Sequence, residues 1–207
     1  MIRVLLAEDQ AMVRGALAAL LALERDLDVV AETGRGDEVV ARAIETRPDV
    51  ALLDIEMPGL DGLAAAAQLR AALPACRVVI LTTFGRPGYL RRAMEAGATG
   101  FLLKDAPATE LADAIRRVAR GQRVVDPALA LTALSEGPNP LSEREREALA
   151  LSATNGTIAD IAAALGLSEG TVRNHLSAAI QKVGARNRAE AARIAADKGW
   201  LAPEVDG

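Results

Sequence analysis

Two side chains that often build protein sites are nearly absent from this sequence. The 207 residues include one cysteine, Cys76, and one histidine, His175. A single cysteine excludes an intrachain disulfide and any cysteine-rich metal site, and its position beside a predicted strand indicates a small core residue. His175 has no neighbouring cluster of ligands in the sequence, so we do not expect it to bind a metal or to act as a catalyst.

Long apolar runs are also absent. No stretch reaches the length of about 20 residues that a membrane-spanning helix needs. The N-terminus begins with the apolar run Val4 to Ala7 and turns acidic at Glu8, which is too short for a signal peptide. We therefore expect a cytoplasmic protein with no membrane association.

The sequence also lacks an excess of basic residues over acidic ones. The 24 basic residues are outnumbered by 28 acidic ones, so the net charge of -4 argues against a protein coated in basic residues. One local basic concentration lies between Thr171 and Arg193, where Glu190 is the single acidic residue. Its basic members are Arg173, Lys182, Arg186, Arg188 and Arg193.

Short apolar segments alternate with helical patterns in the first 120 residues. The predicted strands are Arg3–Ala7, Val29–Glu32, Val50–Leu53, Arg77–Leu81 and Gly100–Leu103, and the predicted helices are Ala11–Leu23, Gly36–Thr46, Gly62–Ala72, Pro87–Glu95 and Ala108–Arg120. Strands that are apolar almost throughout are typical of a sheet buried on both faces. This alternation predicts an α/β fold with a doubly wound, five-stranded parallel sheet.

The pattern changes after Gly121. A short helix is predicted within Val124–Leu134, and Ser135–Pro140 collects turn formers, which indicates a linker. Beyond it the chain is predicted to be all α, with a capping box at Ser142 and Glu145. The predicted helices run from there to about Ala153 and over Ile158–Leu165, Glu169–Val183 and Arg188–Lys198. We therefore divide the chain into residues 1–121, a linker over 122–140, and residues 141–207.

Polar side chains follow most of the predicted strands. Glu8 and Asp9 follow the first strand, Asp54 the third, Thr82 the fourth and Lys104 the fifth. Because the carboxyl ends of parallel strands meet at one edge of a sheet, we expect these side chains to lie together. Three carboxylates repel one another unless a hard cation such as Mg²⁺ neutralises them. A lysine and a hydroxyl beside them suit an added phosphoryl group, which makes Asp54 the candidate nucleophile.

This constellation resembles the receiver domain of bacterial two-component response regulators. The resemblance covers roughly the first 120 residues and rests on Glu8-Asp9, Asp54 with Met57-Pro58-Gly59, Thr82, and Lys104-Asp105. It implies that a sensor histidine kinase phosphorylates Asp54, and that the chain is not a dedicated enzyme although it loses the phosphoryl group by its own hydrolysis.

The resemblance also implies a role for each residue of the site. Asp9 and Asp54 bind Mg²⁺ by their side chains, Glu56 binds it by its backbone carbonyl, and Glu8 contributes through water. Lys104 pairs with the phosphoryl group.

A coupled switch is implied as well. Thr82 moves towards the phosphoryl group while Phe101 swings inward. Members of the family often have tyrosine at the position of Phe101, so here only the apolar part of that switch is present.

Other interpretations of these acids are weaker. Each alone is as consistent with a loop residue or a helix cap as with a site. A dinucleotide site needs a glycine-rich turn after the first strand, where this chain has Ala7-Glu8-Asp9-Gln10-Ala11. An aspartyl-phosphate hydrolase often carries a second aspartate two positions after the nucleophile, where this chain has Glu56, so phosphatase chemistry is a minor alternative.

The segment Ala159–Val183 is typical of a helix-turn-helix, with Gly166 in the turn and Ser168 as the N-cap of the second helix. The residues predicted to be buried are Ile161, Ala164, Leu165, Leu167, Val172, Leu176, Ile180 and Val183. Arg173, Asn174 and Ser177 then point outward, where they can contact bases. His175 is interpreted as a groove-side or packing residue.

From Leu141 to about Arg193 the chain resembles the LuxR-type DNA-binding domain. The segments LSEREREALAL, IADIAAALGLSEGTVRNHL and KVGARNRAEAA carry the resemblance. A receiver followed by this domain is the arrangement of the NarL/FixJ response regulators, and the AEDQ start and the run LSEGTVRNHLSAAI are most similar to the DesR-type subgroup. The implied DNA contacts are Thr171, Arg173, Asn174, Ser177, Lys182, Arg186 and Arg188, the last three at phosphates.

Two departures from that family are visible. Ala159 stands where members often have a lysine, and Ser177 stands where some have a basic residue. Both imply fewer phosphate contacts and a greater need for dimerisation. The structural alternative for this region is a four-helix packing module with a solvated basic face.

We therefore predict a phosphorylation-controlled transcription factor that binds double-stranded DNA as a homodimer. In NarL/FixJ receivers the first and last helices often pair, here Ala11–Leu23 and Ala108–Arg120, and the final helix near Ala189–Ala196 can pair the DNA-binding domains. Two rivals remain: an enzyme with a covalent aspartyl intermediate, and a DNA-binding protein with a decayed receiver that no longer responds to phosphorylation.

Overall fold

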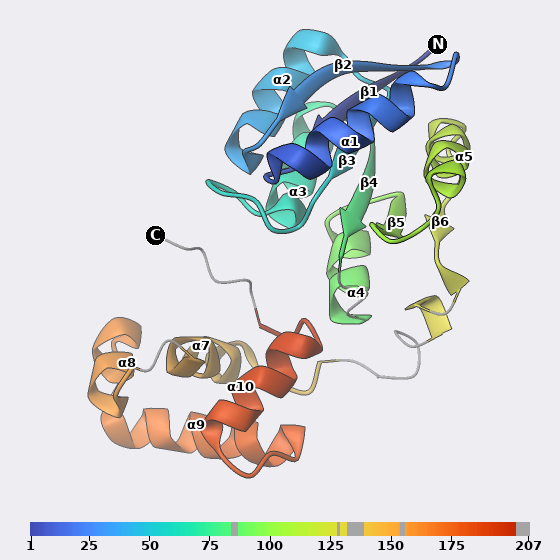
Figure 1. Cartoon of the computed structure of the whole chain (residues 1–207). Coiled ribbons are helices and arrows are strands. Elements are labelled where there is room, and N and C mark those ends of the chain that lie inside the picture. Colours follow the sequence, from blue (N-terminus) through green and yellow to red (C-terminus); the bar gives the residue numbers. More distant parts are fainter. Residues whose placement is uncertain (84–86, 128, 132–138, 154–155, 202–207) are drawn as a thin grey trace. The chain divides into compact units, whose positions relative to one another are not determined.

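The computed structural model describes residues 1–83, 87–127, 129–131, 139–153 and 156–201. The chain divides into two compact units, an N-terminal one built on a sheet and a C-terminal helical one, and each is described by itself (Figure 1). The predicted linker Ser135–Pro140 and the end of the short helix predicted up to Leu134 lie largely outside the described residues. Among those residues, no helix is long and apolar enough to cross a membrane.

The N-terminal unit contains a parallel sheet. Its strands are β1 (Ile2–Ala7), β2 (Leu27–Thr33), β3 (Val50–Leu53), β4 (Arg77–Thr82), β5 (Gly100–Leu103) and β6 (Val124–Val125). They lie in the order β2-β1-β3-β4-β5-β6, and the pairings between them are parallel. The predicted α/β doubly wound sheet is confirmed, and the strand order reverses between β1 and β3, where ligands bind in such sheets.

The sixth strand differs from the prediction. Val124 and Val125 pair with Gly100 and Phe101 of β5, where the sequence predicted the beginning of a short helix. Helical residues begin only at 127, after Asp126 has accepted a hydrogen bond from the Leu129 backbone N–H at 3.0 Å. Two valines beside an open strand edge gain backbone hydrogen bonds, and two residues are too few for a periodicity to reveal this.

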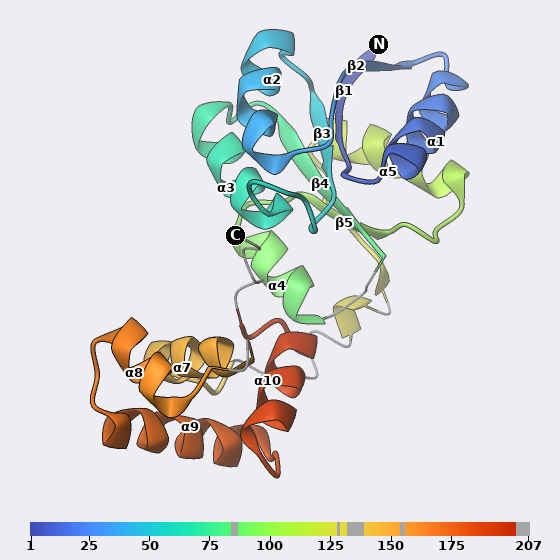
Figure 2. The same cartoon turned by 60° about the vertical axis from the view of Figure 1, so that its left-hand side comes forward.

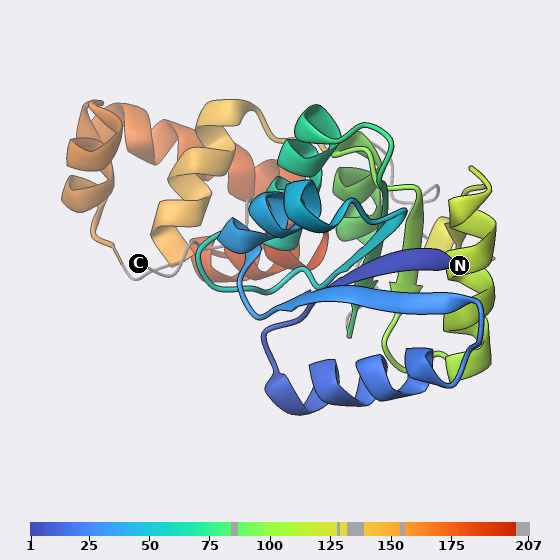
Figure 3. The same cartoon turned by 90° about the horizontal axis from the view of Figure 1, so that it is seen from above.

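Helices cover both faces of the sheet. They are α1 (Ala11–Ala22), α2 (Val39–Thr46), α3 (Gly62–Ala72), α4 (Pro87–Glu95) and α5 (Ala108–Ala119), and a 3-10 turn at Gly36–Glu38 replaces the predicted first turn of α2. Figures 2 and 3 show α1 and α5 on one face and α2 and α3 on the other. This sandwich leaves the strand ends as the place where polar side chains can gather.

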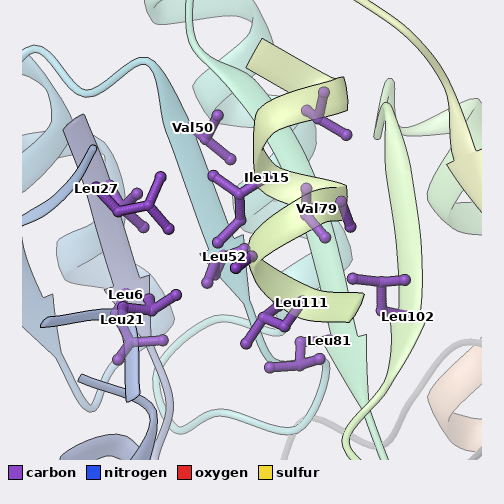
Figure 4. Packing of buried hydrophobic residues seen from close by; sticks show 14 of the residues in the cluster. Leu6, Leu21, Leu27, Val50, Leu52, Val79, Leu81, Leu102, Leu111 and Ile115 are labelled. Carbon is purple, nitrogen blue, oxygen red and sulfur yellow. The ribbon is translucent and has the colours of Figure 1, made fainter. Parts of the chain in front are cut away.

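Apolar packing between α5 and the sheet holds the strands in place. Leu111 and Ile115 of α5 lie against Leu52 of β3 and against Val79 and Leu81 of β4 (Figure 4). All five side chains are buried, and each contributes roughly 1.5–3 kcal/mol by leaving water. The strand ends are therefore fixed relative to one another, which positions the residues that follow them.

The C-terminal unit contains α7 (Glu143–Ala153), α8 (Ile158–Leu165), α9 (Glu169–Val183) and α10 (Arg188–Asp197). The predicted capping box is confirmed, because the Ser142 backbone N–H donates to Glu145 at 2.7 Å and the Glu145 N–H donates to the Ser142 hydroxyl at 3.4 Å. Ser168 caps α9 as predicted. A second capping box, between Thr157 and Asp160 of α8, was not predicted.

Of the residues predicted to be buried in the helical core, three are buried, one is exposed, and four are partly buried and pack against it, namely Leu165, Leu167, Ile180 and Val183. Ile161, Val172 and Leu176 are buried in it, together with Trp200 beyond the end of α10. Ala164 was predicted to be buried and is exposed, because Ala162 occupies the inward position on the short helix α8. Gly166 adopts the left-handed conformation, with φ of 64°, that a turn between α8 and α9 requires.

Candidate functional site

Main-chain hydrogen bonds bring two of the predicted acids side by side. The Asp54 backbone N–H donates to the Ala7 carbonyl at 2.9 Å, which places the end of β3 beside the end of β1. Glu8 follows Ala7 directly, and its N–H donates to the Thr33 carbonyl of β2 at 3.0 Å. The Glu8 and Asp54 side chains are both buried. The pairing of β1 with β2 and β3 therefore forces two carboxylates into one buried place, as predicted.

Lys104 joins these two carboxylates. Its Nζ lies 2.6 Å from Glu8 Oε2 and 2.9 Å from Asp54 Oδ2, and its side chain is 9% exposed. Its backbone N–H donates to the Thr82 carbonyl at 2.8 Å, which ties the end of β5 to the end of β4. The lysine thus reaches across the end of β4 to the nucleophile candidate on β3.

Burial in this site favours the neutral form of the Asp54 carboxyl group. Burial raises the pKa of Asp54 to about 6, although the hydrogen bond from Lys104 acts in the opposite direction. Burial lowers the pKa of Lys104, but the bonds to Glu8 and Asp54 outweigh it and hold that pKa above its ordinary value. The Lys104 ammonium therefore stays charged, and its charge stabilises the buried carboxylates of Glu8 and Asp54.

The carboxylates are arranged as metal ligands. Glu8, Asp9 and Asp54 each offer an oxygen, and these atoms lie within 4.8 Å of one another. Glu8 and Asp54 are buried and Asp9 is exposed, so the group opens to solvent on one side. Three carboxylates beside one ammonium leave negative charge uncompensated, which suits a hard divalent cation with several water ligands. The residues present therefore fit a metal ion.

The remaining predicted receiver residues belong to β4, to β5 and to the loop after β3. Thr82 ends β4 and is 4% exposed, so its side chain is shielded from solvent. Glu56 is exposed two residues after Asp54. Phe101, the predicted switch residue, is fully buried within β5.

One residue of this region was not predicted. Arg14 of α1 donates from its guanidinium to the Glu8 carbonyl at 2.6 Å and lies 3.8 Å from Glu32 Oε2. Gly34 makes room for it, since a side chain there would begin 3.0 Å from the guanidinium. No sequence signal distinguishes Arg14 from other arginines, because its partner is a main-chain carbonyl.

Asp61, in the same loop as Asp54, has the ordinary structural role. Its carboxylate accepts a hydrogen bond from the Ala64 backbone N–H at 2.7 Å and caps α3. Asp61 therefore provides a matched aspartate for comparison with Asp54.

The predicted DNA-contact residues lie on α9, in the turn after it and at the first position of α10. Arg173, Asn174 and Ser177 are exposed. Thr171 is half-buried, and its hydroxyl lies 2.8 Å from that of Ser168. His175 is half-buried. These positions agree with a helix that presents one polar face to solvent.

All three predicted phosphate contacts, Lys182, Arg186 and Arg188, have partners inside their own unit. Lys182 Nζ lies 2.7 and 2.9 Å from the carboxylate oxygens of Glu145, and Arg188 donates to the Gly156 carbonyl at 3.2 Å. Burial would raise the pKa of Glu145, but Lys182 and Ser142 outweigh it and hold that pKa below its ordinary value. The pair ties α9 to α7, so Lys182 has a structural role whatever it contacts on DNA.

Lys182→Met should lower the free energy of unfolding of the helical unit by about 1–2 kcal/mol at neutral pH, because the buried Glu145 carboxylate loses its cation. A depressed acid pKa stabilises above the pKa of the unfolded chain, and that stability is lost as the pH falls through the folded pKa. The difference between the variant and the wild type should therefore shrink as the pH falls below the ordinary glutamate range. Urea titrations followed by the fluorescence of Trp200, the single tryptophan, measure this.

Arg144→Met is the control for that experiment. It breaks an exposed pair on the same helix, in which Arg144 lies 2.8 Å from Glu147. Exposed pairs contribute little, so its loss should be smaller and nearly independent of pH. Equal losses in the two variants, or a Lys182→Met effect that persists in acid, would contradict the proposed role of the pair.

Comparisons with known proteins cover both units. Residues 4–116 match the response regulator receiver domain family, and residues 139–195 match the luxR family of bacterial regulatory proteins. The chain is 48% identical over 201 residues to the uncharacterized transcriptional regulatory protein YvfU of Bacillus subtilis (strain 168), and 46% identical over 201 residues to the transcriptional regulatory protein DesR of the same organism. Each alignment covers 97% of this chain and 100% of the relative.

Solved structures show the same architecture. The response regulator ChrA of a heme-sensing two-component system is 36% identical, with a TM-score of 0.58 over 95% of this chain and 97% of ChrA. The response regulator RcsB, solved as a complex with DNA, has a TM-score of 0.68 over 95% of this chain and 98% of RcsB. At 23% identity this second likeness bears on the fold alone.

Proposed function

The chain belongs to the NarL/FixJ family of two-component response regulators, which join a receiver domain to a LuxR-type DNA-binding domain, and we propose that phosphorylation of Asp54 controls its binding to DNA. It is a regulator of transcription and not a classical enzyme. The observation that carries the proposal is the Lys104 ammonium that bridges Glu8 and Asp54 at 2.6 and 2.9 Å, beside Asp9.

The proposed domains keep their predicted bounds. Residues 1–121 form the receiver, 122–140 the linker, whose strand β6 extends the receiver sheet, and 141–207 the DNA-binding domain. The family matches over 4–116 and 139–195 support this division. Because the proposed partner is DNA, we place the protein in the cytoplasm.

Mg²⁺ is the proposed cofactor. Asp9 and Asp54 would hold it by their carboxylates and Glu56 by its backbone carbonyl, while Glu8 would act through water. When bound, the ion supplies positive charge to the oxygens of a phosphoryl group on Asp54. The uncompensated charge of the three acids supports a divalent ion over a monovalent one.

Asp54 is proposed to receive its phosphoryl group from a phosphorylated histidine of a sensor kinase. A carboxylate oxygen of Asp54 attacks phosphorus, the P–N bond breaks, and the released imidazole takes up a proton from solvent. Lys104, already 2.9 Å from Asp54, would follow the new negative charge, and the Thr82 hydroxyl would donate to it. Autodephosphorylation is attack by water on phosphorus, which breaks the P–O bond and returns the carboxylate and inorganic phosphate.

The signal is proposed to leave the site through Thr82 and Phe101. Thr82 pairs with Leu103 in the sheet, and Lys104 follows Leu103, so a shift of Thr82 towards the phosphoryl group acts directly on β5. Phe101 lies on the same strand. Because Phe101 is fully buried, any movement of its ring requires the surrounding side chains to repack. Such repacking favours two discrete arrangements of the ring and its neighbours.

Dimerisation is proposed to use α1. The exposed residues of this helix are apolar or small, and they include Met12, Leu20 and Leu23, with exposed fractions of 88%, 40% and 77%. Gly15 has no atom within 4 Å of the place where a side chain would begin. An apolar helix face of this kind is typical of a protein interface. We also keep α5 as part of the receiver interface, and α10 as the interface between the DNA-binding domains.

Leu23→Lys should weaken the activated dimer about tenfold to a hundredfold, because it places a charge in an apolar interface. The monomer should fold normally, since Leu23 lies at the C-terminus of α1, where a cation is favourable. Ile44→Lys is the matched control, because Ile44 is 49% exposed on α2, which lies at the opposite face of the sheet (Figure 3). Sedimentation of both variants with beryllium fluoride and Mg²⁺ measures the effect, and equal dimer constants would contradict the α1 interface.

DNA recognition is proposed to use the exposed face of α9. Arg173 and Asn174 would contact guanine and adenine in the major groove, with Thr171 and Ser177 beside them. Lys182, Arg186 and Arg188 would lie near phosphates. Two such domains in a dimer would bind paired half-sites.

Reaction with acetyl phosphate and Mg²⁺ tests the function against the enzyme alternative. A response regulator should take up one phosphoryl group per chain and release it slowly, which intact-protein mass spectrometry and phosphate release measure together. Rapid multiple turnover of small phosphate esters would instead indicate a phosphatase with an aspartyl intermediate. A failure to be modified would indicate a receiver that no longer accepts phosphate.

A further inference from the structure

Two of the arginines proposed to face DNA are already neutralised by glutamates of their own domain. Arg173 lies 2.8 Å from Glu169, four residues earlier on α9. Arg186, in the turn after α9, makes a bidentate pair with Glu190 of α10: its Nε lies 3.0 Å from Oε2 and its terminal nitrogen lies 2.9 Å from Oε1.

The two pairs differ in how firmly they are held. Glu190 also accepts a hydrogen bond from the Arg186 backbone N–H at 2.8 Å, so its carboxylate is fixed by three bonds while the Arg186 side chain stays 87% exposed. Glu169 and Arg173 are both more than half exposed and are joined by one bond. The first pair is thus a fixed part of the turn, and the second is an open pair on the recognition helix.

An arginine paired in this way offers little net charge to a nucleic acid. Salt-dependent affinity for DNA comes from counterions that are released when protein cations neutralise phosphates. An Arg-Glu pair that approaches the duplex as a unit carries no net charge and releases few counterions. Its carboxylate also faces the phosphates with like charge.

We propose that Glu169 and Glu190 limit the affinity of the DNA-binding domain by neutralising Arg173 and Arg186. This inference rests on the proposed function, because it concerns the same DNA surface. Each domain then binds duplex DNA weakly by itself. Two domains held together bind in succession at high effective concentration, so a weak single domain makes binding depend on the dimer.

Glutamine substitutions in the full chain test this. Glu169→Gln and Glu190→Gln keep the size of the side chain and a hydrogen-bond acceptor while removing the negative charge. The probe is a fluorescent duplex of mixed sequence, and its dissociation constant is measured by anisotropy over a series of salt concentrations. Each variant should bind more tightly, and in Glu190→Gln, which frees the proposed phosphate contact Arg186, the slope of log affinity against log salt should be steeper by about 0.9. If the lines meet at 1 M salt, that slope corresponds to about eightfold tighter binding at 0.1 M.

Glu147→Gln is the control for loss of charge alone. Glu147 forms an exposed pair with Arg144 on α7, which carries none of the proposed DNA contacts. It should leave the slope unchanged. Circular dichroism checks that Glu190→Gln folds. If Glu190→Gln does not fold, Glu169→Gln still tests the inference, because Glu169 is exposed at the start of α9.

The possible outcomes distinguish failure of this inference from failure of the proposed function. Unchanged or weaker binding by Glu169→Gln would overturn the inference, and so would an equal gain in Glu147→Gln. In both cases the wild type still binds DNA and the proposed function stands. A wild type that fails to bind any duplex with beryllium fluoride and Mg²⁺ would overturn the proposed function together with the inference.

Discussion

Asp54→Asn should abolish phosphoryl incorporation from acetyl phosphate. The reaction needs a carboxylate oxygen as nucleophile, and an amide of the same shape does not supply one. The variant should fold, because the amide can still accept the hydrogen bond that the Ile55 N–H donates to Asp54 at 2.8 Å. Intact-protein mass spectrometry after incubation with Mg²⁺ and acetyl phosphate measures incorporation directly.

Asp61→Asn is the matched control, because Asp61 lies in the same loop and caps α3. Asparagine caps helices about as well as aspartate, so this variant should be modified like the wild type. Modification of the Asp54→Asn protein at the wild-type level would show that the phosphoryl group goes elsewhere, and the nucleophile assignment would then be wrong.

Lys104→Met should destabilise the metal-free receiver by about 3 kcal/mol. Lys104 is the cation shared by Glu8 and Asp54, and removal of one partner from a buried ion pair leaves uncompensated charge in a poorly solvated place. Mg²⁺ should restore part of the loss, because it binds only the folded site and supplies the missing positive charge. Hydrogen exchange of the backbone amides of β1 and β3, with chelator and with Mg²⁺, measures both effects.

Arg116→Met provides the comparison for Lys104. Arg116 of α5 also bridges two carboxylates, those of Glu24 and Asp26 at 2.6 Å each, but all three groups are partly exposed. The bond to Arg116 holds the pKa of Asp26 at about 2, yet solvent screens the pair, so its loss should be much smaller and indifferent to Mg²⁺. Equal destabilisation by the two variants would contradict the proposal that Lys104 compensates two buried carboxylates at a metal site.

Most of the receiver could be predicted because its elements carry strong local signals. The strands β1 and β3 are almost wholly apolar, and the acids Glu8, Asp9 and Asp54 stand where those strands end. A parallel sheet then has to gather them. The strand β6 could not be predicted in this way, since Val124 and Val125 pair with β5 through main-chain groups that any apolar dipeptide offers.

The helical unit shows the other limit of sequence reasoning. The capping role of Glu145 was predicted from its spacing to Ser142, but its pairing with Lys182, 37 residues later, depends on how α7 packs on α9. The pair between Glu190 and Arg186 lies at a spacing of four residues, but Arg186 precedes the first residue of α10, so the spacing of charges within a helix does not predict it.

The affinity of the full chain for DNA before and after phosphorylation shows whether the state of Asp54 controls DNA binding. The duplex is one selected from genomic fragments by the phosphorylated protein, and affinity is measured for the wild type and for Asp54→Asn, with Mg²⁺ and with or without acetyl phosphate. We expect phosphorylation to tighten binding roughly 5- to 150-fold in the wild type, the usual range of coupling between two sites, and to leave Asp54→Asn unchanged. Equal affinity of the phosphorylated and unphosphorylated wild type would show that phosphorylation of Asp54 does not control DNA binding.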